Sequence, residues 1–472
     1  MRAKVIVYEL NEVPWEIIDL YVAARPASNL ATLVDLGRSY TTVDDDPMPL
    51  QPWRTWPTFH KSMYTRDHNS FDLGQDPATF RGAALWDVVE CSGLRPGLFG
   101  PLQSWPARSF RRGGFYVPDT FSRSPETFPA SLERFQAFNL AMTQENGFSS
   151  DVPLDKRAML GAGLDLVTKG LTPWSALRIA AQLLKEGRDA RYKARRSVLQ
   201  VLPCFDLFWR LHRRYRPHLS VFFTNHVAGM MHRFWGDWVP AYATTENYQP
   251  DKVYRRFILT AMDYFDHQLG RMLRFVDRRR DTCLIVASSM GQNAIPYRGV
   301  QETYVLEQAQ RLITALALSA EPGLAMYPRI ALKFDSESSA EAATTPLSSV
   351  VLGNGAPLFS GFRRLGTTLT FDISTDYPGA EAGRTVRYVP AARSDATDGT
   401  LDDLGIVVRP RMGGGNTAYH VPEGIALAYH PEFEPERSRK RVSVLDAAPS
   451  ILALMRLPPP ASMQGCASMF AG

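Results

Sequence analysis

The stretch KVIVYEL, residues 4–10, decides the fold class, because an alternating and then β-branched apolar run of this kind is typical of a buried strand. Pro14 follows at a position that suits the first turn of a helix. The run SNLATLVDL, residues 28–36, predicts a second helical segment that ends at Gly37. A strand followed closely by helices is the unit from which parallel sheets are built, so this segment predicts the first strand of an α/β sheet.

Strand-like and helix-like runs alternate along most of the chain. Short apolar runs bounded by turn residues predict strands, and apolar residues at helical spacing predict helices. The predicted strands are 96–100, 219–224 (LSVFFT), 282–287 (TCLIVA) and 424–428, and the predicted helices are 84–91, 251–277 and 445–455. This order predicts an α/β fold in which helices sandwich a central, mostly parallel sheet.

The chain of 472 residues is long enough for about three domains of roughly 150 residues each. The alternation of strands and helices instead favours one α/β domain that is enlarged by two insertions. The predicted division is a core formed by 1–125, 219–295 and 405–472, a helical basic insertion over 126–218, and a cap over 296–404.

Basic charge is concentrated in one part of the chain. The totals, 53 Lys and Arg against 48 Asp and Glu, give a formal net charge of only +5, so no nucleic-acid partner is predicted. Residues 155–216 predict a long helical stretch, broken near Gly170, Pro173 and Pro203, and many of its polar positions from 178 to 216 are Lys or Arg. Two interpretations stay open: a solvated helix face, or a surface for weak contact with phosphates or anionic lipid headgroups.

The sequence contains no membrane-spanning or secretory signal. No run reaches the roughly 18 apolar residues of a spanning helix, and the N-terminus has no signal-peptide pattern. The four cysteines are far apart and form no metal-binding pair. We therefore expect a cytoplasmic protein with reduced thiols; the sequence does not indicate its oligomeric state.

Residues capable of chemistry follow the predicted strands. Because functional side chains of α/β sheets gather beyond the carboxyl ends of the strands, those positions are the candidates. They are Glu9 and Asn11 after the first strand, Asn225, His226 and His232 after 219–224, Ser289 after 282–287, His420 before 424–428, and Thr55 in PWRTWPTFHKSMYT. Another histidine, His212, is expected on a surface face of the helical insertion.

Five segments of the chain resemble the alkaline phosphatase superfamily, in its type I phosphodiesterase/nucleotide pyrophosphatase branch. They are VIVYELNEVPWEIID (5–19), RPASNLATLVDLG (25–37), RTWPTFHKSMYT (54–65), HVPEGIALAY (420–429) and RVSVLDAAPSILALMRLPPPASMQG (441–465). The resemblance implies an alkaline-phosphatase-like sheet between helices, and a phosphodiesterase or phosphatase activity. In that family two Zn²⁺ ions about 4 Å apart hold the reacting oxygens, and a Thr or Ser attacks phosphorus.

The resemblance also implies which ligands this chain has lost. The three family aspartates fall on Asn11, Asn225 and Ser289, which suit substrate binding rather than a cation. The nucleophile position is kept as Thr55, and two ligand positions are kept as His232 and His420. Missing carboxylates argue against the standard two-zinc site, because two Zn²⁺ ions would be poorly compensated.

The residues that are kept predict a site with one zinc ion or with none. His232 and His420, with the neighbouring His226 as a third imidazole, would form a three-histidine site with an open position. Glu9 lies two residues before the family position, and it is a candidate ligand or general base; a paired structural carboxylate is equally open. Thr55 is the candidate nucleophile.

Three functions remain open from the sequence. The preferred one is a hydrolase or phosphoryl-group transferase with a remodelled site, acting on a small phosphorylated molecule. The second is a pseudoenzyme that serves as a binding or scaffold module. The third is an enzyme of changed chemistry on the inherited fold, such as a lyase or a group transferase on a biosynthetic intermediate.

Overall fold

In the computed structural model, β1 (Lys4–Leu10) is an inner strand of an eight-stranded sheet of order β19-β2-β18-β6-β1-β5-β3-β4. It runs parallel to β5 (Leu219–Thr224) and to β6 (Thr282–Ala287). The other strands are β2 (Arg38–Val43), β3 (Pro96–Phe99), β4 (Phe115–Val117), β18 (Ala426–Tyr429) and β19 (Glu436–Ser443), of which β18 is antiparallel to both neighbours. The predicted α/β class with a mostly parallel central sheet is confirmed.

The structure describes residues 3–146, 170–297, 302–375, 383–410 and 416–470. Within these ranges, no helix combines the length and the apolar character needed to cross a membrane.

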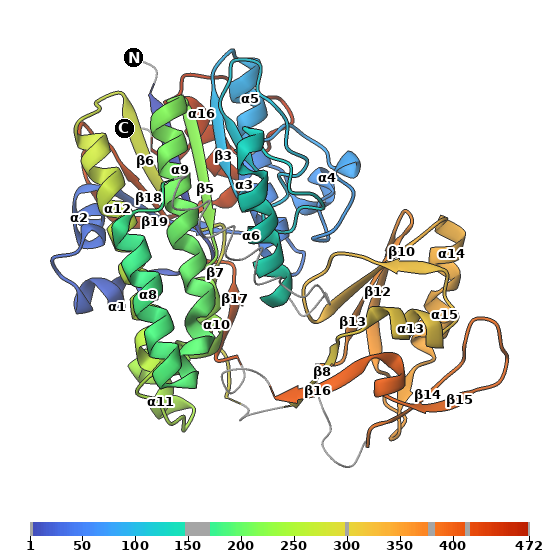
Figure 1. Cartoon of the computed structure of the whole chain (residues 1–472). Helices are drawn as coiled ribbons and strands as arrows, with labels where there is room; N and C mark the ends of the chain where they lie inside the picture. Colours follow the sequence, from blue (N-terminus) through green and yellow to red (C-terminus); the bar gives the residue numbers. More distant parts are fainter. Residues whose placement is uncertain (1–2, 147–169, 298–301, 376–382, 411–415, 471–472) are drawn as a thin grey trace.

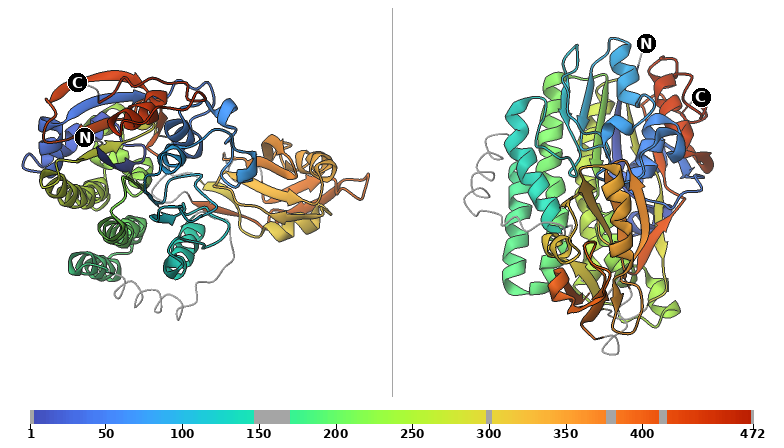
Figure 2. Two further views of the ribbon diagram at one scale, coloured as in Figure 1. Left: turned by 90° about the horizontal axis from the view of Figure 1, so that it is seen from above. Right: turned by 90° about the vertical axis from the view of Figure 1, so that its right-hand side faces the viewer.

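Helices cover both faces of the large sheet (Figures 1 and 2). Alternation along β1 sends Ile6 and Tyr8 to one face and Val5 and Val7 to the other. The first face packs against α1 (Trp15–Ala24), α2 (Asn29–Leu36), α9 (Val201–Tyr215), α10 (Ala228–Trp238) and α12 (Phe257–Asp277). The second packs against α3 (Pro52–Lys61), α5 (Leu85–Cys91) and α16 (Ala447–Leu454). Helices therefore cover both faces of the sheet, and the ends of the strands are left free to form a site.

The helical insertion differs from its prediction at Pro203. The structure has α6 (Glu133–Asn146), α8 (Pro173–Arg188), the 3₁₀ segment η3 (Ala190–Gln200) and then α9. Pro203 lies in the first turn of α9, where a missing N–H costs nothing, so it does not break the helix. The break falls at Asp189, whose side chain accepts a hydrogen bond from the N–H of Arg191. Residues 155–169 of the predicted stretch lie outside the described residues.

His212, which was expected on a surface, is buried in α9. Its Nδ1 lies 2.7 Å from Ser220 Oγ on the adjacent β5. Trp209 stacks on its ring, with centroids 5.2 Å apart. His212 therefore lies on the face of α9 that packs on the sheet, whereas Arg210, Arg213 and Arg214 of the same helix are exposed.

A smaller body lies to one side of the large sheet (Figures 1 and 2). It begins with β8 (Glu302–Leu306), which pairs antiparallel with β16 (Ile406–Pro410). Between them are the helices α13 (Ala309–Ala315), α14 (Glu337–Ala342) and α15 (Thr344–Ser348), a four-stranded sheet, β12 (Phe359–Leu365), β13 (Thr368–Ile373), β10 (Arg329–Phe334) and β9 (Ala320–Pro322), and a three-stranded sheet, β11 (Val351–Leu352), β14 (Thr385–Tyr388) and β15 (Thr397–Thr400). Because β16 belongs to this body, the boundary predicted at 404 falls one strand too early.

Arg329 of the smaller body joins it to the larger one. Its guanidinium pairs with the carboxylate of Asp72, with Nη1 3.2 Å from Oδ1. Arg363 also reaches this loop, where it lies over the Phe71 ring at 3.7 Å. The contact holds the smaller body against the loop that follows α3 and α4 (Thr65–His68).

Candidate metal centre

Glu12, His232 and His420 meet at the carboxyl end of the large sheet. Glu12 Oε2 lies 3.0 Å from His232 Nε2 and 3.4 Å from His420 Nε2. One ligand atom from each side chain lies within 4.8 Å of the other two. His232 comes from α10, and His420 comes from β17 (Ala418–Val421). The turn after β1, the helix after β5 and the strand before β18 thus converge on one point.

Both imidazoles are oriented by backbone carbonyls. Nδ1 of His232 lies 3.1 Å from the carbonyl oxygen of Ala418, and Nδ1 of His420 lies 3.1 Å from that of Leu50. A carbonyl can only accept, so each Nδ1 donates a hydrogen bond to its carbonyl, and each Nε2 is the atom that faces the Glu12 carboxylate. Metal-bound histidines are held in this way, with the second nitrogen donating to a fixed acceptor.

Glu12 is placed by a turn that ends β1. Its φ of 61° lies in the left-handed region, which is uncommon for a residue other than glycine, asparagine or aspartate. Asn11 Nδ2 donates to Glu12 Oε1 at 2.7 Å, and the Gln292 amide donates to Oε2. Strained backbone of this kind persists where surrounding contacts hold it, and it is found at functional sites.

The charges of the three residues depend on one another. Burial by itself would raise the pKa of Glu12, but His420 and His232 hold that pKa well below its usual value. Burial likewise opposes the protonated form of His420, yet Glu12 raises the pKa of His420. A divalent cation between them would replace the imidazolium as the partner of the carboxylate.

Asn11 connects the centre to Asn225 and to α3. Its Nδ2 donates to Asn225 Oδ1 at 2.7 Å, and its Oδ1 accepts from Trp56 Nε1 at 2.7 Å. With the bond to Glu12, the amide is engaged on both its atoms. The position that the family resemblance assigned to an aspartate is therefore occupied by an amide that orients the neighbouring carboxylate.

Thr55 and Ser289 are brought together by α3 and the end of β6. Thr55 Oγ1 lies 2.7 Å from Ser289 Oγ, and both side chains are buried. The adjacent Ser288 hydroxyl donates to the carbonyl of Leu10 and accepts from the N–H of Val13 at 3.1 Å. These bonds tie the segment that carries Ser289 to the turn that carries Glu12.

His226, named as a third ligand from the sequence, does not lie in the group with His232 and His420. Its Nδ1 is 2.6 Å from Thr224 Oγ1, and its Nε2 is 3.1 Å from the carbonyl oxygen of Ala261. Both nitrogens are thus engaged inside the larger core. Burial lowers the pKa of His226 to about 3.

The buried His226 gives a stability prediction. Its pKa is near 6.5 in the unfolded chain and lower in the folded one, so the unfolded chain binds the extra proton as the pH falls. The stability that neutral His226 supports is present above about pH 6.5 and is lost below it. Between pH 7.0 and 5.5 the advantage of the wild type over His226→Gln in unfolding free energy is expected to shrink by about 1.3 kcal/mol.

Urea unfolding at the two pH values measures this difference. Phe222→Leu is the matched control, because it disturbs the same core without removing a titrating group. Its difference from the wild type is expected to stay constant with pH. An advantage over His226→Gln that does not change between pH 7.0 and 5.5 would contradict a neutral, buried His226.

Glu9 faces the opposite side of β1 from the larger helical core. Its Oε1 lies 2.5 Å from His60 Nε2, and both side chains are buried. Trp56 stacks on the His60 ring, with centroids 5.7 Å apart. Glu9 Oε2 has no hydrogen-bond partner in the described part of the chain. Glu9 is therefore placed beside His60, apart from the three-residue group.

Glu9→Ala is expected to lower the unfolding free energy by about 3 kcal/mol, because it leaves His60 buried without its partner. Zinc content is expected to stay unchanged, since Glu9 is not in the three-residue group. Chemical denaturation and metal analysis of the same preparation measure both effects. Loss of zinc with unchanged stability would instead assign Glu9 to the metal centre.

Glu12 is the site residue that sequence reasoning missed. Alternation along an extended strand pairs Glu9 with Asn11 on one face, and it gives Glu12 no role. The chain stops being extended at Glu12, and the left-handed turn there reverses that expectation. The available signal was its position, one residue after Asn11, which the family resemblance aligns with a ligand position.

The donor set of Glu12, His232 and His420 suits a zinc ion. Two imidazole nitrogens and one carboxylate form a recurring three-ligand zinc set that leaves a position for substrate. Nδ1 of each imidazole already donates to a fixed carbonyl, which leaves Nε2 to bind a metal in exchange for its proton, and the carboxylate is held by Asn11 and Gln292. The buried charge of Glu12, otherwise balanced only through protonated histidine, also favours a cation.

Comparisons with known proteins give a likeness to solved structures only. No family model matches the chain, and no curated protein matches it. Among solved structures it is similar to murine ectonucleotide pyrophosphatase/phosphodiesterase 5, solved as an inactive variant in complex with AMP, to a second structure of that murine protein, and to its human counterpart. Each is 10% identical with a TM-score of 0.41, over 97% of this chain and 96% of that one.

Proposed function

We propose that the chain is a metal-dependent phosphoesterase that uses one zinc ion held by Glu12, His232 and His420. The observation that supports this most directly is the convergence of two Nε2 atoms on one carboxylate, at 3.0 and 3.4 Å. The order of Thr55, His232 and His420 along the chain, and its resemblance to the phosphodiesterase motifs, supports the choice of a phosphate ester as substrate.

The protein's own groups have distinct roles in this proposal. Asn11 and Gln292 hold the Glu12 carboxylate, and the carbonyls of Ala418 and Leu50 hold the two histidines. This rigidity fixes the ligands before substrate arrives, which spares the reaction the cost of ordering them. A zinc ion bound there would act as a Lewis acid toward phosphate oxygens.

Thr55 is the proposed nucleophile. Its hydroxyl is fixed by Ser289 and buried, so little water competes with it for the phosphorus. Its oxygen would form the new bond to phosphorus as the bond from phosphorus to the leaving oxygen breaks, and the Thr55 proton would pass to that oxygen, which departs as an alcohol. Water would then attack phosphorus, releasing the phosphate and restoring the Thr55 hydroxyl. Asn225, held by Asn11, is the proposed hydrogen-bond donor to a phosphate oxygen.

Metal analysis combined with an activity assay tests the proposed function. Protein purified without chelator is expected to carry about one equivalent of zinc, and to hydrolyse an aryl phosphate mono- or diester with zinc present. The chelator dipicolinate should remove the bound zinc and abolish the hydrolysis, and added zinc should restore the zinc content and the activity. Protein without zinc that turns over neither ester would overturn the proposal and favour a binding module.

A further inference from the structure

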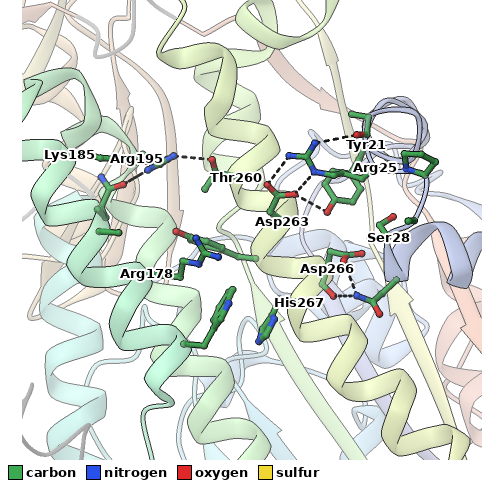
Figure 3. Close-up of a pocket in the computed structure, with 18 residues that line it drawn as sticks. Tyr21, Arg25, Ser28, Arg178, Lys185, Arg195, Thr260, Asp263, Asp266 and His267 are labelled. Carbon is green, nitrogen blue, oxygen red and sulfur yellow. Dashed lines mark hydrogen bonds and ion pairs between the residues drawn. The ribbon is translucent and has the colours of Figure 1, made fainter.

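A cavity lies on the helical side of the molecule, apart from the metal centre. It has a volume of about 670 Å³, which is in the range of small-molecule sites. It lies between α8 and α12, and the turn between α1 and α2 closes one side (Figure 3). Its lining contains none of Glu12, His232, His420 and Thr55.

Three cations gather on the α8 side of this cavity: Arg178, Lys185 and Arg195 (Figure 3). Arg195 is buried, and it donates to Gln182 Oε1 at 2.6 Å and to Thr260 Oγ1 at 2.9 Å, both neutral acceptors. In the described residues, none of the three makes an ion pair with a carboxylate. In this part of the chain, the positive charge on this wall is therefore not neutralised by a direct carboxylate contact.

The two carboxylates that line the opposite wall are already engaged. Asp263 pairs with Arg25, with Oδ1 3.2 Å from Nε, and it accepts from the Tyr21 hydroxyl. Asp266 accepts from Asn29 Nδ2 and from the backbone N–H of Leu30 in the first turn of α2. Neither is directed to the cations of α8, so the cavity is positive along one wall.

The positive wall is also partly pre-ordered. Trp174 and His267 stack with centroids 3.7 Å apart, and the Arg178 guanidinium lies over Trp174 at 5.3 Å. Burial, and then the nearby charge of Arg195, lower the pKa of Lys185. A bound anion would relieve this repulsion, and less side-chain freedom would be lost on binding.

We propose that this cavity binds a small phosphate-bearing anion. A phosphate group carries more charge than a carboxylate, and its oxygens match the donors of two guanidinium groups and one ammonium. The proposal does not depend on the activity of the metal centre. The source of the phosphate is a free small molecule or the headgroup of an anionic lipid, because Leu177 and Leu184 are exposed on the same helix.

Calorimetric titration with inorganic pyrophosphate tests the free source. The double variant Arg178→Gln/Lys185→Gln is expected to bind at least tenfold more weakly than the wild type. Arg188→Gln is the matched control, because Arg188 is exposed on the same helix and does not line the cavity. Its affinity is expected to stay within twofold. If Arg188→Gln weakened pyrophosphate binding as much as the double variant does, the proposed site would be wrong, and general electrostatic attraction to the basic helix would explain the binding.

Sedimentation with vesicles of phosphatidylcholine and phosphatidic acid tests the lipid source. If the headgroup is the ligand, binding is expected to fall in the double variant and also in Leu177→Ser/Leu184→Ser, but not in Arg188→Gln. If the ligand is free, pyrophosphate binds and the vesicles do not. Absence of binding in both experiments at low salt overturns the proposal, whatever the metal centre is found to do.

Discussion

Glu12→Gln is expected to lower bound zinc from about one equivalent to near zero at micromolar protein, and to lower ester hydrolysis at least a hundredfold. Glutamine keeps the length of the side chain, but it removes the negative charge that faces His232 and His420. A neutral amide is a much weaker zinc ligand than a carboxylate, and the two remaining imidazoles would not hold the ion. Atomic emission analysis of zinc and the aryl ester assay measure the two effects.

Glu16→Gln is the matched control for this substitution. Glu16 lies four residues later in the first turn of α1, where its side chain is exposed. The same change of charge there is expected to leave zinc and turnover within twofold of the wild type. Full zinc occupancy in Glu12→Gln would show that the carboxylate is not a ligand, and the one-zinc assignment would then be wrong.

Thr55→Val is expected to lower turnover about a thousandfold while zinc stays bound. Valine keeps the branched shape of threonine in its buried position but has no hydroxyl. If that hydroxyl attacks phosphorus, the variant can react only through slower attack by water. Ser289→Ala, which releases Thr55 Oγ1 from its 2.7 Å partner, is expected to lower turnover only about tenfold.

Thr58→Val separates a structural effect from a chemical one. Thr58 is buried in the same helix, and its hydroxyl donates to the carbonyl of Arg54. Its loss should cost about 1 kcal/mol of unfolding free energy, with turnover within threefold of the wild type. Wild-type turnover in Thr55→Val with zinc retained would exclude Thr55 as nucleophile, and it would indicate direct attack by water.

The sequence predicted the sheet better than it predicted the site. The strands at 4–10, 219–224 and 282–287 are confirmed, because each is a mainly apolar run of which nearly every residue is buried. The sequence also singled out His232, after the strand 219–224, and His420, before the strand at 424–428, and the structure brings the two together. Strands and their ends can be predicted from the order of apolar and polar residues within a short segment, and a single sequence contains this information.

The parts that were missed depend on tertiary structure. The role of Glu12 depends on one left-handed residue, and no local pattern in ELNEV predicts it. The burial of His212 depends on the packing of α9 against β5, where Ser220 contacts its Nδ1. The edge of the smaller body depends on β8 and β16, which pair although about a hundred residues separate them.

The pairing of β8 with β16 has a consequence for how this protein can change over time. Glu302 and Pro410 are partners in register, so the smaller body departs from the chain and returns to it at one place. When the ends of an insertion already meet, its length adds little to the entropy of closing the fold. Such a module can be lengthened, shortened or exchanged while the large sheet keeps its register. Evolution could therefore change the smaller body without changing the positions of Glu12, His232 and His420.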